Sequence, residues 1–427
     1  LFGLIPAIQA SRPALVAALK DLGAGMRGGR ARMRAALVIA QLALSLMLLA
    51  AAGLMVRSFL NLRSVHPGFD PAGVLTMNIA LPSARYTEDA PRAASFYQQL
   101  AERIEAMPGV LAAGFAERMP MVSGWLCTGV TIQGGSESGM RGDCPPTSLV
   151  SPGYFEAMGM RIDGRPLTWD GLNQHSGDML VSRAFAERHW PDEGAVGKGI
   201  KYNGATPPFY RVSGVVDDVL GDGLDQPPVP LVYFPLLPIP GADLYDAHVY
   251  MHLAVRTAGD PMTLAPSITR AVGELEPGAT IGDVEPMEAI VAHSMARRTF
   301  TMLLLGIAAA MAVFLSVIGL YGVISYIVGQ RRSEIAIRMA LGAGVSRVSG
   351  MVLVQTLRLA VLGVVIGAWG ALLATRVLES LLYHVSPTDP LMVGLAGLLL
   401  LAVAVLAGYG PARRAASVQP ADALRAD

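Results

Sequence analysis

Four stretches of this chain are apolar and almost free of charge, and each is about as long as a membrane is thick. Residues 35–56, 299–330 and 391–410 contain no Asp, Glu, Lys or Arg, and residues 351–375 contain only Arg358. A helix needs about 20 such residues to cross a bilayer, and an arginine near a helix end can extend to the interface. A buried soluble helix could explain one stretch, but four together predict transmembrane helices at 34–57, 299–330, 351–376 and 391–410.

The basic residues near these helix ends predict an orientation. If the helices alternate in direction, every basic cluster falls on one side of the membrane, which the positive-inside rule assigns to the cytoplasm. Both termini are then cytoplasmic, and residues 58–296 lie outside. We therefore expect a multi-pass protein of the inner (cytoplasmic) membrane with a large periplasmic domain. The clusters are Arg27, Arg30, Arg32 and Arg34; Arg331, Arg332, Arg338 and Arg347; and Arg413, Arg414 and Arg425.

Composition agrees with a membrane location. Hydrophobic residues make up 52% of the chain and charged residues 15%, whereas soluble domains carry about 25% charged residues. The net charge is zero, which argues against a nucleic-acid partner bound through a basic surface.

The long segment between the first two predicted spans repeats one pattern. An apolar strand at 74–81 precedes an amphipathic helix that begins near Thr87 and ends at Pro108-Gly109, and a strand at 110–116 follows. The same order returns as a strand at 249–255, a helix at 261–275, Pro277-Gly278 and a strand at 280–284.

The middle of this segment differs from its ends, being rich in Gly, Pro and short strands over about 120–245. We therefore expect a two-part α+β subdomain with an inserted β-rich subdomain. The predicted fold class is an α-helical membrane protein with four transmembrane helices and an α+β extracytoplasmic domain.

Two cysteines lie in the predicted insertion. Disulfides persist outside the cytoplasm, so we expect a bridge between Cys127 and Cys144, although the sequence does not show how far apart they lie.

A short charged segment follows the second predicted span, at 331–350. Ile335, Met339 and Leu341 can form one apolar face, surrounded by charged residues, and the turn at 342–344 ends the helix. Such a helix suits docking onto a cytoplasmic partner, and it could equally lie among the lipid headgroups.

The sequence of this segment, RRSEIAIRMALGA at 331–343, resembles the signature of MacB/FtsX-type ABC transporter permeases. VSPGYFEAMGM at 150–160 and VSRAF at 181–185 look like the periplasmic core domain of that family, and GPARRAA at 410–416 and PADALR at 420–425 resemble its C-terminal pattern. The order of one span, a large outer domain and three further spans is also the family's architecture.

The resemblance implies a permease subunit with no ATPase activity and no cofactor of its own. It implies a separate cytoplasmic ABC ATPase, a second permease unit as a homodimer or duplicated chain, and a periplasmic partner. ATP hydrolysis in the ATPase would move the outer domain in export or envelope processes. By this analogy the contact with the ATPase involves Glu334, Ile335, Arg338, Leu341 and Gly342.

Residues 1–33 form a predicted cytoplasmic segment with an echo of the C-terminal tail at 411–427. Gly3-Leu4-Ile5-Pro6-Ala7 is similar to residues 408–412, with approximate spacing to the next shared positions. We expect this segment to be the tail of a preceding permease unit, as in the duplicated permeases of the acidobacterial type, although two short Ala-rich tails can match by chance.

The chain offers no catalytic or metal motif. Gly197-Lys198 lacks the spacing of a phosphate-binding loop, and His248 and His252, four apart on a predicted strand, are best explained as two exposed histidines. Two further function classes remain open: a transmembrane sensor or regulator whose outer domain binds a ligand or envelope enzyme, and a membrane-anchored enzyme. A permease requires an ATPase that binds at 331–350, whereas an enzyme would turn over without ATP.

Overall fold

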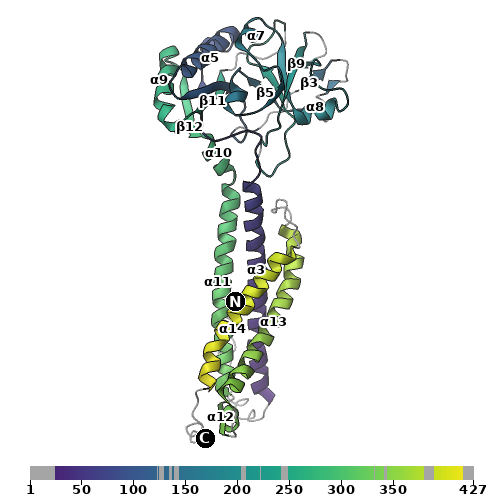
Figure 1. Cartoon of the computed structure of the whole chain (residues 1–427), viewed down its shortest axis with the longest axis vertical. Coiled ribbons are helices and arrows are strands. Elements are labelled where there is room, and N and C mark those ends of the chain that lie inside the picture. Colours follow the sequence, from purple (N-terminus) through teal and green to yellow (C-terminus); the bar gives the residue numbers. More distant parts are fainter. Residues whose placement is uncertain are drawn as a thin grey trace. The chain divides into compact units, whose positions relative to one another are not determined.

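The computed structural model describes residues 25–122, 124, 129–133, 137–138, 144–202, 208–221, 223–241, 249–330, 332–340, 344–378 and 389–416. The chain divides into two compact units (Figure 1). The first, the helical unit, comprises the chain up to Arg63 and from Arg298 onward. The second, the sheet domain, comprises Ser64–Arg297.

Among the described residues, the helical unit has four long apolar helices and one short helix. The stretches at 32–63, 299–330, 346–373 and 390–414 are long and apolar enough to cross a membrane, which confirms the four-helix prediction. The helices are α3 (Gly25–Arg63), α11 (Ala296–Gln330), α12 (Arg332–Ala340), α13 (Val345–Leu378) and α14 (Pro390–Ala416).

Glycines allow α13 to lie directly against α3. A Cβ atom at Gly367 would lie 2.8 Å from the carbonyl oxygen of Ala43 and 2.9 Å from its Cα atom, and one at Gly363 would lie 2.6 Å from Leu42 Cβ. Both glycines stand four residues apart on one helix face, an arrangement that lets membrane helices approach closely. On another face of α3, Ser45 and Ser316 of α11 share a buried hydrogen bond of 2.8 Å.

The described strands of the sheet domain join in one mixed sheet. Its order is β12-β1-β11-β2-β5-β10-β7-β9-β8-β3-β4, with β6 paired to β9. The strands are β1 (Val74–Ala80), β2 (Val110–Ala116), β3 (Val130–Ile132), β4 (Glu137–Ser138), β5 (Thr147–Val150), β6 (Ile162–Gly164), β7 (Asp178–Ser182), β8 (Gly199–Tyr202), β9 (Tyr210–Val216), β10 (Val232–Pro235), β11 (Tyr250–Thr257) and β12 (Thr280–Pro286).

The helices of the domain are short by comparison with those of the helical unit. They are α4 (Ser83–Tyr86), α5 (Ala90–Glu105), α6 (Tyr154–Ala157), α7 (Trp169–Asn173), α8 (Arg183–His189), a 3₁₀ turn (Pro261–Leu264), α9 (Ala265–Leu275) and α10 (Met287–Ser294).

Helix α5 packs on one face of the sheet, as its sequence pattern predicts. Asp89 caps its start by accepting a hydrogen bond from the Arg92 amide. Its apolar face is buried, and the ring of Tyr97 contacts that of Phe115 on β2 at a centroid distance of 4.9 Å. Helix α9 lies beside α5, and Arg103 of α5 pairs with Glu274 of α9.

Helix α6 packs on the opposite face, because alternate residues of a strand point to opposite sides. Gly114 neighbours Phe115 on β2, and a Cβ atom at Gly114 would lie 2.1 Å from the Tyr154 amide nitrogen. Only a residue without a side chain leaves room for α6 at this distance.

The middle segment continues the same sheet as the two ends. Strand β5 of the expected insertion at about 120–245 pairs with β2 outside it, through Val150 and Ala116, and β10 continues the sheet from β5 to β7. Two hydrophobic cores are nevertheless present, a larger one built on β1, β2, β11, α5 and α9 and a smaller one built on β7, β8, β9 and α8. The larger core also includes Tyr154 and Tyr233 of the middle segment, so the two parts share a sheet and this core, and the middle segment has the smaller core in addition.

Candidate functional site

Helix α12 has one buried face and one exposed face. Ile335 is 4% exposed and packs in the hydrophobic cluster that includes Ile324 of α11 and Val352 of α13. On the other side Ile337 is 50% exposed, and Glu334 and Arg338 are half-exposed. The exposed face of α12 therefore presents one isoleucine between two charged residues.

A charged pair spans one turn of this exposed face. Arg338 Nη2 lies 2.6 Å from Glu334 Oε1, and Arg338 Nη1 lies 3.3 Å from the sulfur of Met351 on α13. Arg338 therefore connects Glu334 on the exposed face of α12 to Met351 on the helix that follows.

Basic side chains of α3 and α14 contact tyrosines of α11 at the end of the helical unit that carries α12. The Arg34 guanidinium of α3 lies 4.2 Å above the ring of Tyr326, near the end of α11, and Arg414 of α14 donates a 2.8 Å hydrogen bond to the Tyr321 hydroxyl. At the opposite end of α3, Arg57 pairs with Asp389 just before α14. Arg34, Arg338 and Arg414 thus lie at the α12 end of the helical unit, as the sequence pattern predicts, whereas Arg57 lies at the other end.

Some sequence-predicted site residues lie outside the described part of the chain. Leu341 and Gly342 are among them, so the coupling role of the whole segment stays a proposal. Cys144 is disulfide-bonded, and Cys127, the partner that the sequence proposes for it, lies outside the described residues.

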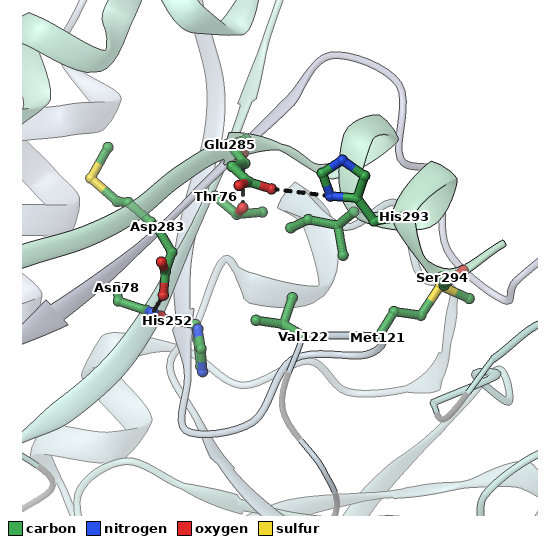
Figure 2. A pocket seen from close by; sticks show the side chains of 11 residues that line it. Thr76, Asn78, Met121, Val122, His252, Asp283, Glu285, His293 and Ser294 are labelled. Atoms are coloured by element: carbon green, nitrogen blue, oxygen red, sulfur yellow. Dashed lines mark hydrogen bonds and ion pairs between the residues drawn. The ribbon is translucent and has the colours of Figure 1, made fainter. Parts of the chain in front are cut away.

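A pocket of about 400 Å³ lies in the sheet domain, against the β1–β12 edge of the sheet. Figure 2 shows side chains from both strands, from α10 and from residues 121–122 arranged around it. We call it the sheet-edge pocket, and it is lined by Thr76, Met77, Asn78, Met121, Val122, His252, Asp283, Glu285, Ile290, His293 and Ser294.

A β-bulge shapes one wall of this pocket. Thr76 and Asn78, two residues apart on β1, pair with Glu285 and Gly282, three residues apart on β12. The stretch of β12 between these two partners therefore holds one extra residue, and Asp283 within it has a left-handed conformation with φ of 46°. Bulges re-aim side chains, and here the Asp283 carboxylate accepts a 2.6 Å hydrogen bond from Asn78 Nδ2.

His252 is buried beside this bulge, so the expectation of two exposed histidines is wrong for this residue. It is 4% exposed because β11 lies between β1 and β2, with Asn78 and Ala116 as its direct partners. Burial lowers the pKa of His252 to about 4, and the Asp283 carboxylate opposes that shift. The other histidine, His248, lies outside the described residues.

Sequence reasoning missed both this pocket and the glycine contact between α3 and α13. The glycine spacing at 363 and 367 is readable in the sequence. The pocket has no local signal, because its walls come from four separate segments. Within the described part of the chain, no group of three His, Cys, Asp or Glu residues is placed to hold a metal ion.

Comparison with known proteins places the chain in a family. Residues 35–286 match the MacB-like periplasmic core domain, and residues 306–420 match the FtsX-like permease C-terminal region. An uncharacterized ABC transporter permease, YvrN of Bacillus subtilis (strain 168), is 28% identical over 300 residues, covering 66% of this chain and 70% of YvrN.

Two further matches cover less of this chain. The pyoverdine export ATP-binding/permease protein PvdT of Pseudomonas syringae pv. syringae (strain B728a) is 29% identical over 181 residues, which span 42% of this chain and 27% of PvdT. The periplasmic region of MacB from Actinobacillus actinomycetemcomitans superposes with a TM-score of 0.36 and 14% identity, over 55% of this chain and 95% of that one; this likeness is too weak to add to the assignment. On the two family matches, which together cover most of its length, the chain belongs to the ABC transporter permeases with a MacB-like periplasmic core domain and an FtsX-like C-terminal region.

Proposed function

We propose that this permease transmits the ATP cycle of a separate cytoplasmic ATPase to its sheet domain, with α12 as the docking helix. Membership of the ABC transporter permeases implies an ATPase partner. The observation that carries the proposal is the exposed face of α12, where Ile337 lies between the charged residues Glu334 and Arg338.

The position of α12 suits transmission as well as docking. It begins at Arg332, directly after α11 ends at Gln330, and Ile335 is packed against both α11 and α13. A force on α12 therefore acts on two long helices through a packed contact. Helix α11 in turn follows α10 of the sheet domain after the single residue Met295.

The charge distribution supports the orientation that this function needs. The basic residues Arg34, Arg338 and Arg414 stand at the α12 end of the helical unit, and such clusters face the cytoplasm. In this orientation the protein spans the inner membrane, α12 faces a cytoplasmic ATPase, and the sheet domain is periplasmic.

We further propose that the working complex holds a second permease unit, as a homodimer or as a duplicated chain, and engages a periplasmic partner. The similarity to a protein named for pyoverdine export supports a role in export or envelope processes. Cys144 and Cys127 would close a loop on the periplasmic side, where a disulfide persists.

Co-purification tests the docking contact. The tagged permease is co-expressed with the ATPase encoded beside it, and the ATPase retained is quantified for wild type, Glu334→Lys and Ile337→Asp. We expect at least tenfold less ATPase with either variant. A matched control, Glu274→Lys, reverses an equally exposed carboxylate in the sheet domain and should retain the wild-type amount. Full retention by both α12 variants, or association of wild type with no ATPase, would refute the proposal.

A further inference from the structure

We propose that the sheet-edge pocket binds a small organic cation, namely a protonated primary amine on a short apolar chain. This site is separate from the α12 contact and does not depend on the ATPase.

Two buried polar atoms at the pocket lack a hydrogen-bond partner among the described residues. Asn78 is 5% exposed and His252 is 4% exposed, and within the part of the chain that the structure describes neither Asn78 Oδ1 nor His252 Nε2 has a hydrogen-bond partner. The bond from Asn78 Nδ2 to Asp283 fixes the amide orientation, because a carboxylate oxygen requires a donor. A buried polar atom without a partner costs about 1–3 kcal/mol, so a ligand that donates to Asn78 Oδ1 recovers that cost.

The charges at the pocket select a cation. Asp283 and Glu285 contribute two carboxylates, and the described lining contains no lysine or arginine. Arg118 also acts on His252 electrostatically, but it is not part of the lining, and its guanidinium donates to the Gly124 carbonyl. An ammonium group supplies three donors and a positive charge, which match Asn78 Oδ1 and the Asp283 carboxylate.

The volume of the pocket and its apolar walls limit the size and polarity of the group that carries the amine. A volume of about 400 Å³ lies at the small end of the range for ligand sites. Met121 and Val122 (Figure 2), together with Ile290, provide an apolar surface that suits a short hydrocarbon chain. The backbone is strained at the same place, since Met121 and Asp283 both have positive φ angles, and such strain is concentrated at functional sites.

Occupancy would fix the helix that leads into the membrane-spanning part of the chain. Ile290, His293 and Ser294 of α10 line the pocket opposite Thr76 and Asn78 of β1. A ligand in contact with both sides holds α10 against the sheet edge. Because α11 begins at Ala296, with a single residue between it and the end of α10, a bound amine would act on the helix that follows the site in the chain.

Calorimetric titration of the full chain in detergent tests this site with three probes of matched shape. They are n-butylamine, n-butanol and butyrate, which carry a positive, a neutral and a negative head group. We expect saturable binding of n-butylamine and at least tenfold weaker binding of the other two. Asp283→Asn should weaken n-butylamine binding at least tenfold, and asparagine tolerates the left-handed backbone at this position. Glu274→Gln, an exposed carboxylate elsewhere in the domain, is the control and should bind as wild type.

A second variant and a second readout locate the ligand. Glu285→Gln removes the other carboxylate of the lining, and it replaces Asp283→Asn in the binding test if that variant does not fold. Hydrogen exchange of the α10 amides should slow with n-butylamine in wild type only. Equal binding of all three probes, binding of none, binding of a divalent cation without the amine, or no effect of either carboxylate variant would overturn the proposal.

Discussion

Arg338 bridges two helices of the proposed docking site, with Nη2 placed 2.6 Å from Glu334 Oε1 on α12 and Nη1 placed 3.3 Å from the Met351 sulfur on α13. The guanidinium therefore holds the exposed face of α12 in a fixed relation to α13. Both partners of the ion pair are half-exposed, so its contribution to stability is small and its position on the surface is what matters for docking.

Glu334→Lys should leave the free energy of unfolding within about 1 kcal/mol of wild type, because exposed pairs one turn apart contribute about 0.3–0.5 kcal/mol. Thermal unfolding of the permease in detergent measures this. The charge-swapped double variant, Glu334→Lys with Arg338→Glu, should regain the small loss in stability without regaining the ATPase. Restored docking in the double variant would mean that the ion pair, rather than the exposed carboxylate, carries the contact.

Gly367→Ala should destabilise the helical unit by about 1–3 kcal/mol, the usual cost of overpacking a core. The added methyl group would meet Ala43 backbone atoms at 2.8 Å and 2.9 Å, and a backbone cannot move aside as a side chain can. Gly394→Ala on α14 is the matched control, because a Cβ atom there meets nothing within 4 Å. Equal melting temperatures for the two variants would show that α3 and α13 do not pack closely at Gly367.

Acid should destabilise the sheet domain through His252. Burial lowers its pKa to about 4 in the folded protein, whereas the unfolded chain has an ordinary value near 6.5. Between these values the unfolded chain binds a proton that the folded chain does not, so stability falls as the pH falls from 6.5 to 4. The full effect is on the order of 3 kcal/mol.

The variant His252→Gln isolates this effect, since it cannot take up the proton. Thermal unfolding at a series of pH values should show a smaller acid loss for the variant than for wild type. Other groups, including Glu105 and Glu117, whose pKa values are raised by burial, are the same in both proteins. Parallel curves for the two proteins over this pH range would contradict the buried, neutral state of His252.

Glu276→Gln should destabilise the sheet domain by about 1–3 kcal/mol, the cost of breaking charge-assisted hydrogen bonds at a buried group. The carboxylate is 5% exposed and lies 2.9 Å from Arg85, and it accepts a 2.8 Å hydrogen bond from the Tyr86 hydroxyl. The bond from Tyr86 is the largest cause that lowers the pKa of Glu276, and Arg85 adds to it. Glu274→Gln, an exposed change two residues away, should cost less than 0.5 kcal/mol, and an equal loss in both variants would refute this role.

The sequence predicted the elements whose hydrophobic period is local. The strand at 110–116 coincides with β2, and Pro277-Gly278 does lie between α9 and β12. His252 was misplaced because a strand pattern shows which residues share a face but not what covers that face. Asp283 was missed for a related reason: the bulge exists only in the pairing of β12 with β1, and these strands are far apart in the chain.

The most direct test of the central claim is ATP hydrolysis by the reconstituted complex of the permease and the ATPase encoded beside it. We predict vanadate-sensitive hydrolysis that rises with wild-type permease and falls at least tenfold toward the rate of the ATPase alone with Ile337→Asp, while Glu274→Lys behaves as wild type. The same rate with and without permease would contradict coupling, and it would favour a sensor or regulator that shares the architecture of the family.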